Sequence, residues 1–174
     1  MADRTSATPL LALDAVAFDT ETTSLDPRAA RIVEIGAVRL TSGRLSEDDT
    51  FRALVNPQVP IPPVSTGVHG IDDEKVRAAP NFAKVWPEVS DYIGGSVVVG
   101  QSIGYDLAIL ANETDRAGIS FSRPRTLDVR LLAQIVEPSL AGYSLDSLAA
   151  WLGVKAVDRH SALGDALTAA RIFV

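Results

Sequence analysis

The sequence of 174 residues contains no cysteine. Disulfide bridges, thiolate metal sites and cysteine nucleophiles are therefore excluded, and the composition fits a reducing compartment. No apolar run approaches the length of a membrane-spanning helix. Residues 1–8 are polar and lack the apolar core of a signal peptide. We therefore expect a cytoplasmic protein that makes no contact with a membrane.

Lysine and histidine are scarce as well. The chain has three lysines and two histidines, and its formal net charge is −6. Proteins that coat nucleic acid neutralise many phosphates with lysine and arginine. If a protein of this charge handles nucleic acid, we expect it to grip a short segment through bound metal ions and local arginines.

Apolar residues make up 47% of the sequence, and its length suits one domain with its own core. Apolar or alternating runs predict strands, and runs with helical periodicity predict helices. Loops are expected at 22–29 and in the proline-rich stretch 56–63. The expected strands cover 15–18, 31–40, 50–55, 97–100 and 125–128, and the expected helices cover 72–78, 81–93, 105–117, a segment ending at 137, 144–152 and 161–174.

The order of these elements predicts an α/β domain. Short connections between the first three strands favour an antiparallel meander, and the later strands alternate with helices, which favours parallel pairing. We expect a mixed sheet flanked by helices over residues 14–174, after a lead-in at 1–13. The last helix is still apolar at 172–174 and has no stop signal. Either it docks to its very end or the sequence was excised from a longer multidomain chain, and we favour the second interpretation.

Asp19 and Glu21 stand two residues apart at the end of the first apolar strand, in the run F-D-T-E-T-T. Side chains at i and i+2 of a strand point to the same face, so the two carboxylates should lie together. Buried carboxylates repel each other unless a cation lies between them, and hard divalent cations prefer oxygen ligands. Taken alone, the pair is better explained by a solvated aspartate and a glutamate paired with an arginine.

Three more residues extend this pattern. Asp106 stands at the start of the predicted helix 105–117, where an acid also complements the helix dipole. His160 and Asp165 belong to the run R-H-S-A-L-G-D-A. Ser161 is the expected N-cap of the last helix, which places His160 in the preceding loop and Asp165 in the first turns. Each of these residues also has an ordinary structural explanation when it is considered alone.

In the order D-x-E, D and H-x4-D, the sequence resembles the DEDDh, or DnaQ-like, family of 3′–5′ exonucleases. This family includes the epsilon subunit of bacterial DNA polymerase III and ribonuclease T. The resemblance covers almost the whole chain and implies a ribonuclease-H-like fold, in agreement with the mixed sheet expected above. Its segments are V-A-F-D-T-E-T-T-S-L-D, I-V-E-I-G-A-V, V-H-G-I, G-Y-D-L-A-I-L, S-L-D-S-L-A and H-S-A-L-G-D-A.

The resemblance implies a two-metal mechanism with nucleoside 5′-monophosphates as products. Two ions about 3.5–4 Å apart can stabilise the attacking and the leaving oxygen at phosphorus, and a histidine can accept a proton from the attacking water. Single-stranded DNA and RNA 3′ ends both fit the sequence, as do proofreading beside a polymerase, repair and RNA trimming. Two Mg²⁺ or Mn²⁺ ions would be held by the four matching carboxylates, Asp19, Glu21, Asp106 and Asp165, and His160 would be the general base.

The resemblance also assigns residues around the terminal nucleotide. Backbone amides of the loop after the first pair would contact it, a leucine would pack near the last base, and an aromatic ring could stack on a base or belong to the core. These residues are Thr22, Thr23, Leu25, His69 and Tyr105. The sequence departs from the family at Ser24, where glycine is usual, and at Gln101 and Ser102, where histidine and asparagine are usual. These departures bear on substrate preference and site packing rather than on the reaction class.

Two other classes of function fit less well. The run D-T-E-T faintly resembles the D-x-D-x-T motif of haloacid-dehalogenase-type phosphatases, but Glu21 is the wrong residue for that motif and H-x4-D would be unexplained. An exonuclease-like module that only binds its partners would be expected to lack one of the acids, and none is missing. Glu34 and Asp128 fall outside the four-acid pattern, and we expect an arginine partner for Glu34 and a helix-capping role for Asp128.

Overall fold

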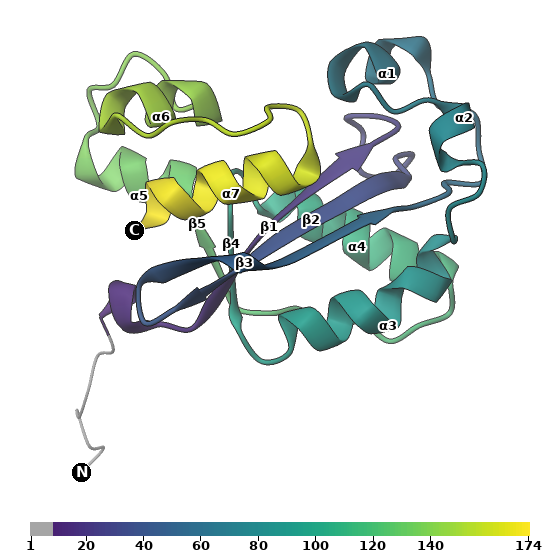
Figure 1. The fold of residues 1–174 in the computed structure, drawn as a ribbon, viewed down its shortest axis with the longest axis horizontal. Helices are drawn as coiled ribbons and strands as arrows, with labels where there is room; N and C mark the ends of the chain where they lie inside the picture. Colours follow the sequence, from purple (N-terminus) through teal and green to yellow (C-terminus); the bar gives the residue numbers. More distant parts are fainter. Residues whose placement is uncertain (1–8) are drawn as a thin grey trace.

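The computed structural model describes residues 9–174, in which five strands form one mixed sheet (Figure 1). The order across the sheet is β3-β2-β1-β4-β5. β2 is antiparallel to both β1 and β3, whereas β4 is parallel to both β1 and β5. The strands are β1 (Ala15–Thr22), β2 (Ile32–Thr41), β3 (Arg44–Leu54), β4 (Val97–Gly100) and β5 (Thr126–Asp128). The expected antiparallel meander extended by parallel strands is confirmed.

Helices cover both faces of the sheet (Figure 1). The helices of the described residues are the 3₁₀ helix η1 (Leu10–Ala12), α1 (Pro63–His69), α2 (Asp73–Val76), α3 (Phe82–Ile93), α4 (Gly104–Arg116), α5 (Val129–Val136), α6 (Leu145–Leu152) and α7 (Ala162–Phe173). α3 and α4 enclose one core with the sheet, and α5, α6 and α7 enclose the other. Among these helices, none combines the length and the hydropathy needed to cross a bilayer.

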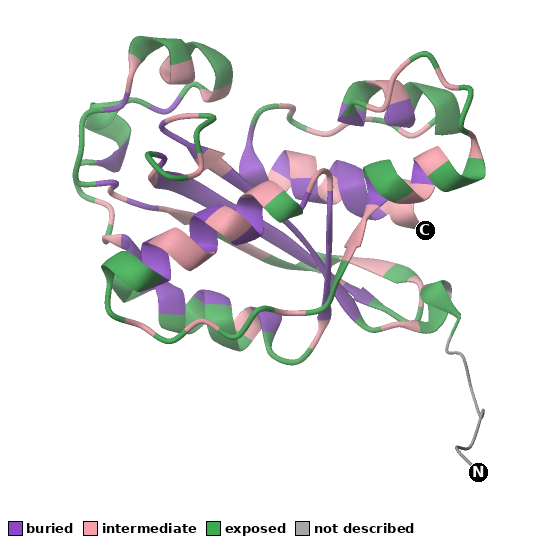
Figure 2. Ribbon diagram, turned by 180° about the vertical axis from the view of Figure 1, so that it is seen from behind, coloured by how far each residue is buried: buried purple, intermediate pink, exposed green. Residues whose placement is uncertain are grey.

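β1 lies in the middle of the sheet and is buried on both faces (Figure 2). Val16 and Phe18 point into the core beneath α3 and α4. Ala15 and Ala17 point into the core beneath α5, α6 and α7. The alternation of a strand therefore assigns each later residue of β1 to one of these two faces.

Three elements differ from the expectations. β3 begins at Arg44 rather than at 50, because it is an edge strand whose exposed, polar residues hide the alternation. β1 continues to Thr22, so that the loop begins later than expected. α1 was not predicted, although Pro63 occupies its first turn, where proline is favoured. η1 falls within the lead-in expected at 1–13, of which 1–8 lie outside the described residues.

Candidate active site

The C-terminal end of β1 carries the D-x-E pair. Asp19 and Glu21 continue the face of Ala15 and Ala17, so both carboxylates lie on the side of the sheet that α7 covers. In the register with β2, Asp19 stands opposite Gly36. The absence of a side chain at this glycine turns out to be needed for the site.

Gly36 lets the first turn of α7 lie against β2. A Cβ at this position would lie 2.1 Å from the backbone carbonyl carbon of Ala162, a distance that no real contact allows. Ser161 caps the helix as expected, since its Oγ accepts a hydrogen bond from the Gly164 amide at 3.1 Å. The close approach and the cap bring Asp165, in the first turns of α7, over the end of β1.

Glu34 of β2 fixes the same end of α7. Its side chain is fully buried, and its Oε2 accepts a hydrogen bond from the backbone amide of Ala162 at 2.8 Å. Its Oε1 pairs with the guanidinium of Arg52 at 2.8 Å. The expected arginine partner is confirmed, and the carboxylate also satisfies an amide that the helix leaves free.

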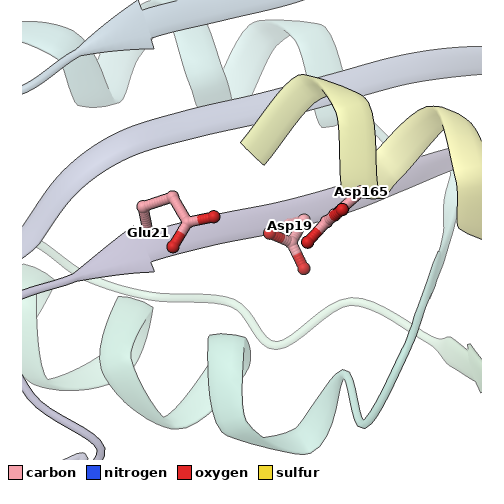
Figure 3. A group of neighbouring side chains, drawn as sticks. All are labelled: Asp19, Glu21 and Asp165. Atoms are coloured by element: carbon pink, nitrogen blue, oxygen red, sulfur yellow. The ribbon is translucent and has the colours of Figure 1, made fainter. Parts of the chain in front are cut away.

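Asp19, Glu21 and Asp165 converge in space (Figure 3). One carboxylate oxygen from each residue lies within 4.8 Å of the other two. Burial, and then the charges of the neighbouring acids, raises the pKa of Asp19 well above its ordinary value. Burial, and then the charge of Asp165, raises the pKa of Glu21 to about 7. These carboxylates have too little positive charge nearby to balance them when they ionise. Clustered oxygen donors of this kind fit a hard divalent cation.

Asp106 approaches the cluster from the opposite side of β1. It lies in the first turn of α4, and its Oδ1 accepts hydrogen bonds from the amide of Thr20 at 3.0 Å and from the Thr20 hydroxyl at 2.7 Å. Burial raises its pKa to about 7, although the bonds from Thr20 act in the opposite direction. Its charge raises the pKa of Asp19, so the two acids are close, but it is outside the group of three convergent acids.

The residue that reaches the cluster from the turn before α7 is Arg159, not His160. The Arg159 guanidinium pairs with Asp165 and also with Asp146 of α6. His160 is exposed, has a φ of 62° and makes no side-chain hydrogen bond within the part of the chain that the structure describes. The structure therefore places His160 next to the site in sequence, with its imidazole outside the acid cluster.

This constellation matches a known family. A family model named RNase_T, with the description Exonuclease, matches residues 16–173. The chain belongs to this exonuclease family. The relationship to DEDDh, DnaQ-like exonucleases that the sequence predicts is thereby confirmed, and the ribonuclease-H-like fold agrees with it.

Curated relatives of this exonuclease domain are longer proteins. A DNA polymerase III subunit epsilon-like protein of Rhodobacter capsulatus is 41% identical over 170 residues, which are 96% of this chain and 24% of the relative. A DNA polymerase III of the PolC type from Caldanaerobacter subterraneus is 34% identical over 159 residues, which are 91% of this chain and 11% of the relative. The chain thus spans a quarter or less of the length of these two relatives.

Solved structures share the fold. The nuclease domain of 3′hExo, described as a DEDDh family member bound to rAMP, superposes with a TM-score of 0.80 at 20% sequence identity. The match covers 91% of this chain and 88% of that chain. At this level of identity, the superposition establishes the arrangement of strands and helices of the exonuclease domain.

The loop after β1 contains Thr23 and Leu25, two of the residues expected near a terminal nucleotide. Leu25 is 91% exposed, which is unusual for a leucine in a short, well-anchored loop. The Tyr105 hydroxyl bonds to the Ser24 carbonyl at 2.5 Å and to the Thr22 hydroxyl at 3.0 Å, so Tyr105 ties α4 to this loop. Ser65 of α1 donates a hydrogen bond to the carbonyl of Thr23 at 2.9 Å.

His69 is the last residue of α1 and lies on the same side of the molecule as the loop after β1. Its Nδ1 accepts a hydrogen bond from the Ile71 amide at 3.0 Å, so the proton of the neutral ring is on Nε2. Nε2 is buried and has no partner among the residues described. Burial lowers the pKa of His69 and so favours its neutral form, although the backbone of Thr22 acts in the opposite direction.

The two departures at the end of β4 have structural partners. Gln101 donates a hydrogen bond from Nε2 to the carbonyl of Tyr143 at 2.7 Å, and the Ser102 amide donates to Asp128 at 3.0 Å. Asp128 also caps α5 by accepting a hydrogen bond from the Arg130 amide, as expected. These contacts anchor the segment that leads into α4 and Asp106.

Sequence reasoning missed three contributors to the site: Thr20, Gly36 and Arg159. Thr20 belongs to the D-x-E motif itself, where its alternating position already predicts a side chain on the α4 face. The only signal for Gly36 is a glycine inside an apolar strand, which often marks a close approach of backbone. Arg159 precedes the histidine in R-H-S-A-L-G-D-A, and only the fold reveals its partner.

Proposed function

We propose that this domain is a divalent-metal-dependent 3′–5′ exonuclease that shortens single-stranded nucleic acid and releases nucleoside 5′-monophosphates. The observation that carries the proposal is the convergence of Asp19, Glu21 and Asp165 within 4.8 Å, from two elements that meet at one end of the sheet. Membership of the exonuclease family supports it. Hydrolysis at phosphorus needs positive charge at this point, and the buried acids provide a place to hold it.

Two Mg²⁺ or Mn²⁺ ions would be held by Asp19 together with the other carboxylates of the site. The convergent acids offer three carboxylates, and Asp106 adds a fourth, because its Oδ2 accepts no hydrogen bond within the described residues while Oδ1 is held by Thr20. When bound, the ions supply the charge that stabilises the attacking and leaving oxygens of the phosphodiester. The chain itself keeps the acids close, buried and in fixed orientations.

His160 is the general base of this proposal. It directly precedes the cap of α7, and its exposed imidazole is free to accept a proton from the attacking water once substrate is bound. A rotation of the side chain toward the cluster is required, and catalytic hydrogen bonds often tighten only in the complex with substrate. Removal of this proton acceptor should cost about 10²–10⁴ in rate.

The terminal nucleotide is proposed to bind between the loop after β1 and α1. The main chain at Thr22 lies beside the nucleotide, and the exposed Leu25 packs against the last base. The Thr23 amide already donates to the carbonyl of Arg31 at 2.9 Å, so Thr23 supports the loop in this proposal. His69 offers its unpaired Nε2–H as a hydrogen-bond donor to the substrate. Tyr105 holds the loop through Ser24, and its ring is partly available for stacking.

Single-stranded DNA is the favoured substrate, and a polymerase is the favoured partner. The relative that is 41% identical is named for the epsilon subunit of DNA polymerase III, and the PolC-type relative is itself named as a polymerase. The solved structure bound to rAMP is only 20% identical in sequence to this chain, and RNA is the alternative substrate that it suggests. We also propose that this domain is one part of a longer chain, as it is in these relatives.

The test uses a 5′-labelled single-stranded DNA oligonucleotide and its RNA counterpart, with Mn²⁺, Mg²⁺ or EDTA. We expect a ladder that shortens from the 3′ end, release of nucleoside 5′-monophosphates, and faster loss of DNA. Asp19→Asn and EDTA should each abolish the ladder. Asp48→Asn removes the same charge from an exposed position of β3 and should leave the rate unchanged.

His160→Gln separates chemistry from metal binding. We expect it to slow cleavage about 10²–10⁴-fold while the affinity for Mn²⁺ stays within twofold of the wild type. If folded wild-type protein shortens neither oligonucleotide with Mn²⁺, the exonuclease proposal is wrong for this chain. An exonuclease-like binding module would then be the better description.

A further inference from the structure

Arg159 is the cation that the fold supplies to the acid cluster. Its Nη1 donates to Oδ1 of Asp165, which is one of the three convergent carboxylates. Across the described chain, no other lysine or arginine side chain pairs with Asp19, Glu21, Asp106 or Asp165. Its side chain is only 24% exposed, so the guanidinium sits at the site and not in bulk solvent.

The same guanidinium has a second partner outside the cluster. Its Nε donates to Oδ1 of Asp146 at 2.5 Å, and its Nη2 lies 3.3 Å from Oδ2 of the same residue. Asp146 lies in the first turn of α6, and its side chain is 64% exposed. Arg159 therefore bridges a partly buried acid of the site and an exposed acid beside it, with a bidentate pair to the exposed one.

The turn that carries Arg159 is strained. Asp158 and His160 flank it with φ values of 35° and 62°, in a region that residues other than glycine seldom adopt. Arg159 lies in this turn and contacts Asp165 and Asp146 from it.

We propose that Arg159 is an internal counter-ion. It pairs with Asp165 when no metal ion is bound, and it releases Asp165 to the divalent cation while remaining bound to Asp146. This inference rests on the proposed metal site. The Asp165 oxygen that accepts the guanidinium N–H cannot at the same time face a cation, because like charges at such distances repel strongly. Asp146 lowers the cost of the exchange, because the displaced guanidinium keeps its bidentate partner and does not have to be fully released.

The proposal predicts opposite effects for the two partners. Arg159→Met removes the competitor and should tighten Mn²⁺ binding about fivefold or more. Asp146→Asn leaves Asp165 as the only charged partner of Arg159, so Mn²⁺ binding should weaken about threefold or more. In the double variant, the effect of Asp146→Asn should disappear, because Asp146 acts through Arg159.

Free Mn²⁺, measured by its electron paramagnetic resonance signal during titration of protein, gives these affinities without any assay of activity. Arg171→Met is the matched control: it removes the same charge from α7, where Arg171 pairs with Glu47 at 2.6 Å. Its affinity for Mn²⁺ should stay within twofold of the wild type. Near-ultraviolet circular dichroism checks folding, and Arg159→Gln replaces Arg159→Met if the latter does not fold.

Three outcomes would overturn the inference: equal Mn²⁺ affinity of the wild type and Arg159→Met, weaker binding by Arg159→Met, or an undiminished effect of Asp146→Asn in the double variant. If the wild type shortens 3′ ends and binds Mn²⁺ while one of these results holds, only the role of Arg159 is wrong. If the wild type binds no Mn²⁺ at all, the proposed metal site fails and this inference fails with it.

Discussion

Two carboxylate sites of this domain differ in how much nearby positive charge balances them. The first site is Glu113 of α4. Its side chain is 2% exposed, and it pairs with Nε of Arg31 at 2.6 Å and with Nη1 of Arg116 at 3.5 Å. The amide of Ile32 adds a hydrogen bond at 3.4 Å. Two cations and a backbone donor thus surround one negative charge, as a buried charge requires.

The acid cluster at the end of β1 has the opposite balance. Within the described residues, Arg159 is the one lysine or arginine that pairs with any of Asp19, Glu21, Asp106 and Asp165, and its partner is Asp165. Burial and mutual repulsion consequently raise the pKa of Asp19 and of Glu21. The comparison teaches that a structural acid such as Glu113 is folded together with its cations, whereas the acids of the proposed metal site are left short of positive charge.

Glu113→Gln should have the largest effect on stability. The substitution leaves Arg31 and Arg116 without their buried carboxylate, and breaking such a pair costs about 3 kcal/mol. Urea denaturation of the metal-free protein measures the loss. The stabilisation that Mn²⁺ adds should be the same as in the wild type, because the acid cluster is untouched. A loss of less than about 1 kcal/mol would remove the distinction between the two sites.

The pH dependence of stability should come from the acid cluster. The pKa values of Glu21 and Asp106 are raised to about 7 in the folded chain, from ordinary values of 4.5 and 3.8. The folded protein therefore binds more protons than the unfolded chain within this window, and its stability falls as the pH rises from about 4 to 7. We expect a loss of several kcal/mol in EDTA, because each unit of pKa difference corresponds to about 1.4 kcal/mol.

Metal ions should weaken this dependence of stability on pH, because a divalent cation favours the ionised acids. Thermal unfolding between pH 5 and 8, in EDTA and in saturating Mn²⁺, checks the prediction. The midpoint should fall with pH in EDTA and change much less in Mn²⁺. Identical profiles in the two solutions would show that the cluster is not short of positive charge.

Asp19→Asn should stabilise the metal-free domain, in contrast to Glu113→Gln. The amide cannot ionise, so the cost of burying a negative charge among other acids disappears. We expect a gain of about 1 kcal/mol at pH 8, or about 2–4 °C in the unfolding midpoint, and a smaller gain at pH 5. Differential scanning calorimetry measures both values. A loss of stability at pH 8 would mean that Asp19 is already compensated.

The sequence predicted the order and pairing of the strands more completely than the contacts that build the site. The antiparallel meander and parallel strands, the cap at Ser161 and the arginine partner of Glu34 followed from local patterns, and the structure confirms them. The edge strand β3 and the exposed helix α1 were misread, because solvent-facing residues carry little periodicity. Local sequence is informative where a residue has one buried face.

Contacts between distant segments could not be predicted in the same way. The pairing of Arg159 with Asp146, and of Asp106 with Thr20, depends on how α6, α7 and α4 pack around β1. The roles of the four acids and His160 remain predictions that the proposed experiments test. What the structure adds is that three acids converge, while Asp106 is held from the other face of the strand.

Asp106 differs from the other acids of the site because hydrogen bonds partly compensate its charge. The substitution Thr20→Val tests this difference, and its expected effect is the smallest. Thr20 satisfies Asp106 with a hydroxyl and an amide, so this acid is partly compensated, as Glu113 is. Valine keeps the shape but removes the hydroxyl donor, which should raise the pKa of Asp106 above about 7. The ionised carboxylate, which is the proposed metal ligand, is then less populated near neutral pH.

We expect Thr20→Val to weaken Mn²⁺ binding about threefold to tenfold at pH 6.5 and much less at pH 8.5. Titrations at the two pH values measure the ratio. Thr114→Val is the matched control, because the Thr114 hydroxyl is also buried and donates to the carbonyls of Leu110 and Ala111, away from the acids. A ratio that does not change with pH would mean that the hydroxyl only supports packing, and that Asp106 is as uncompensated as Asp19.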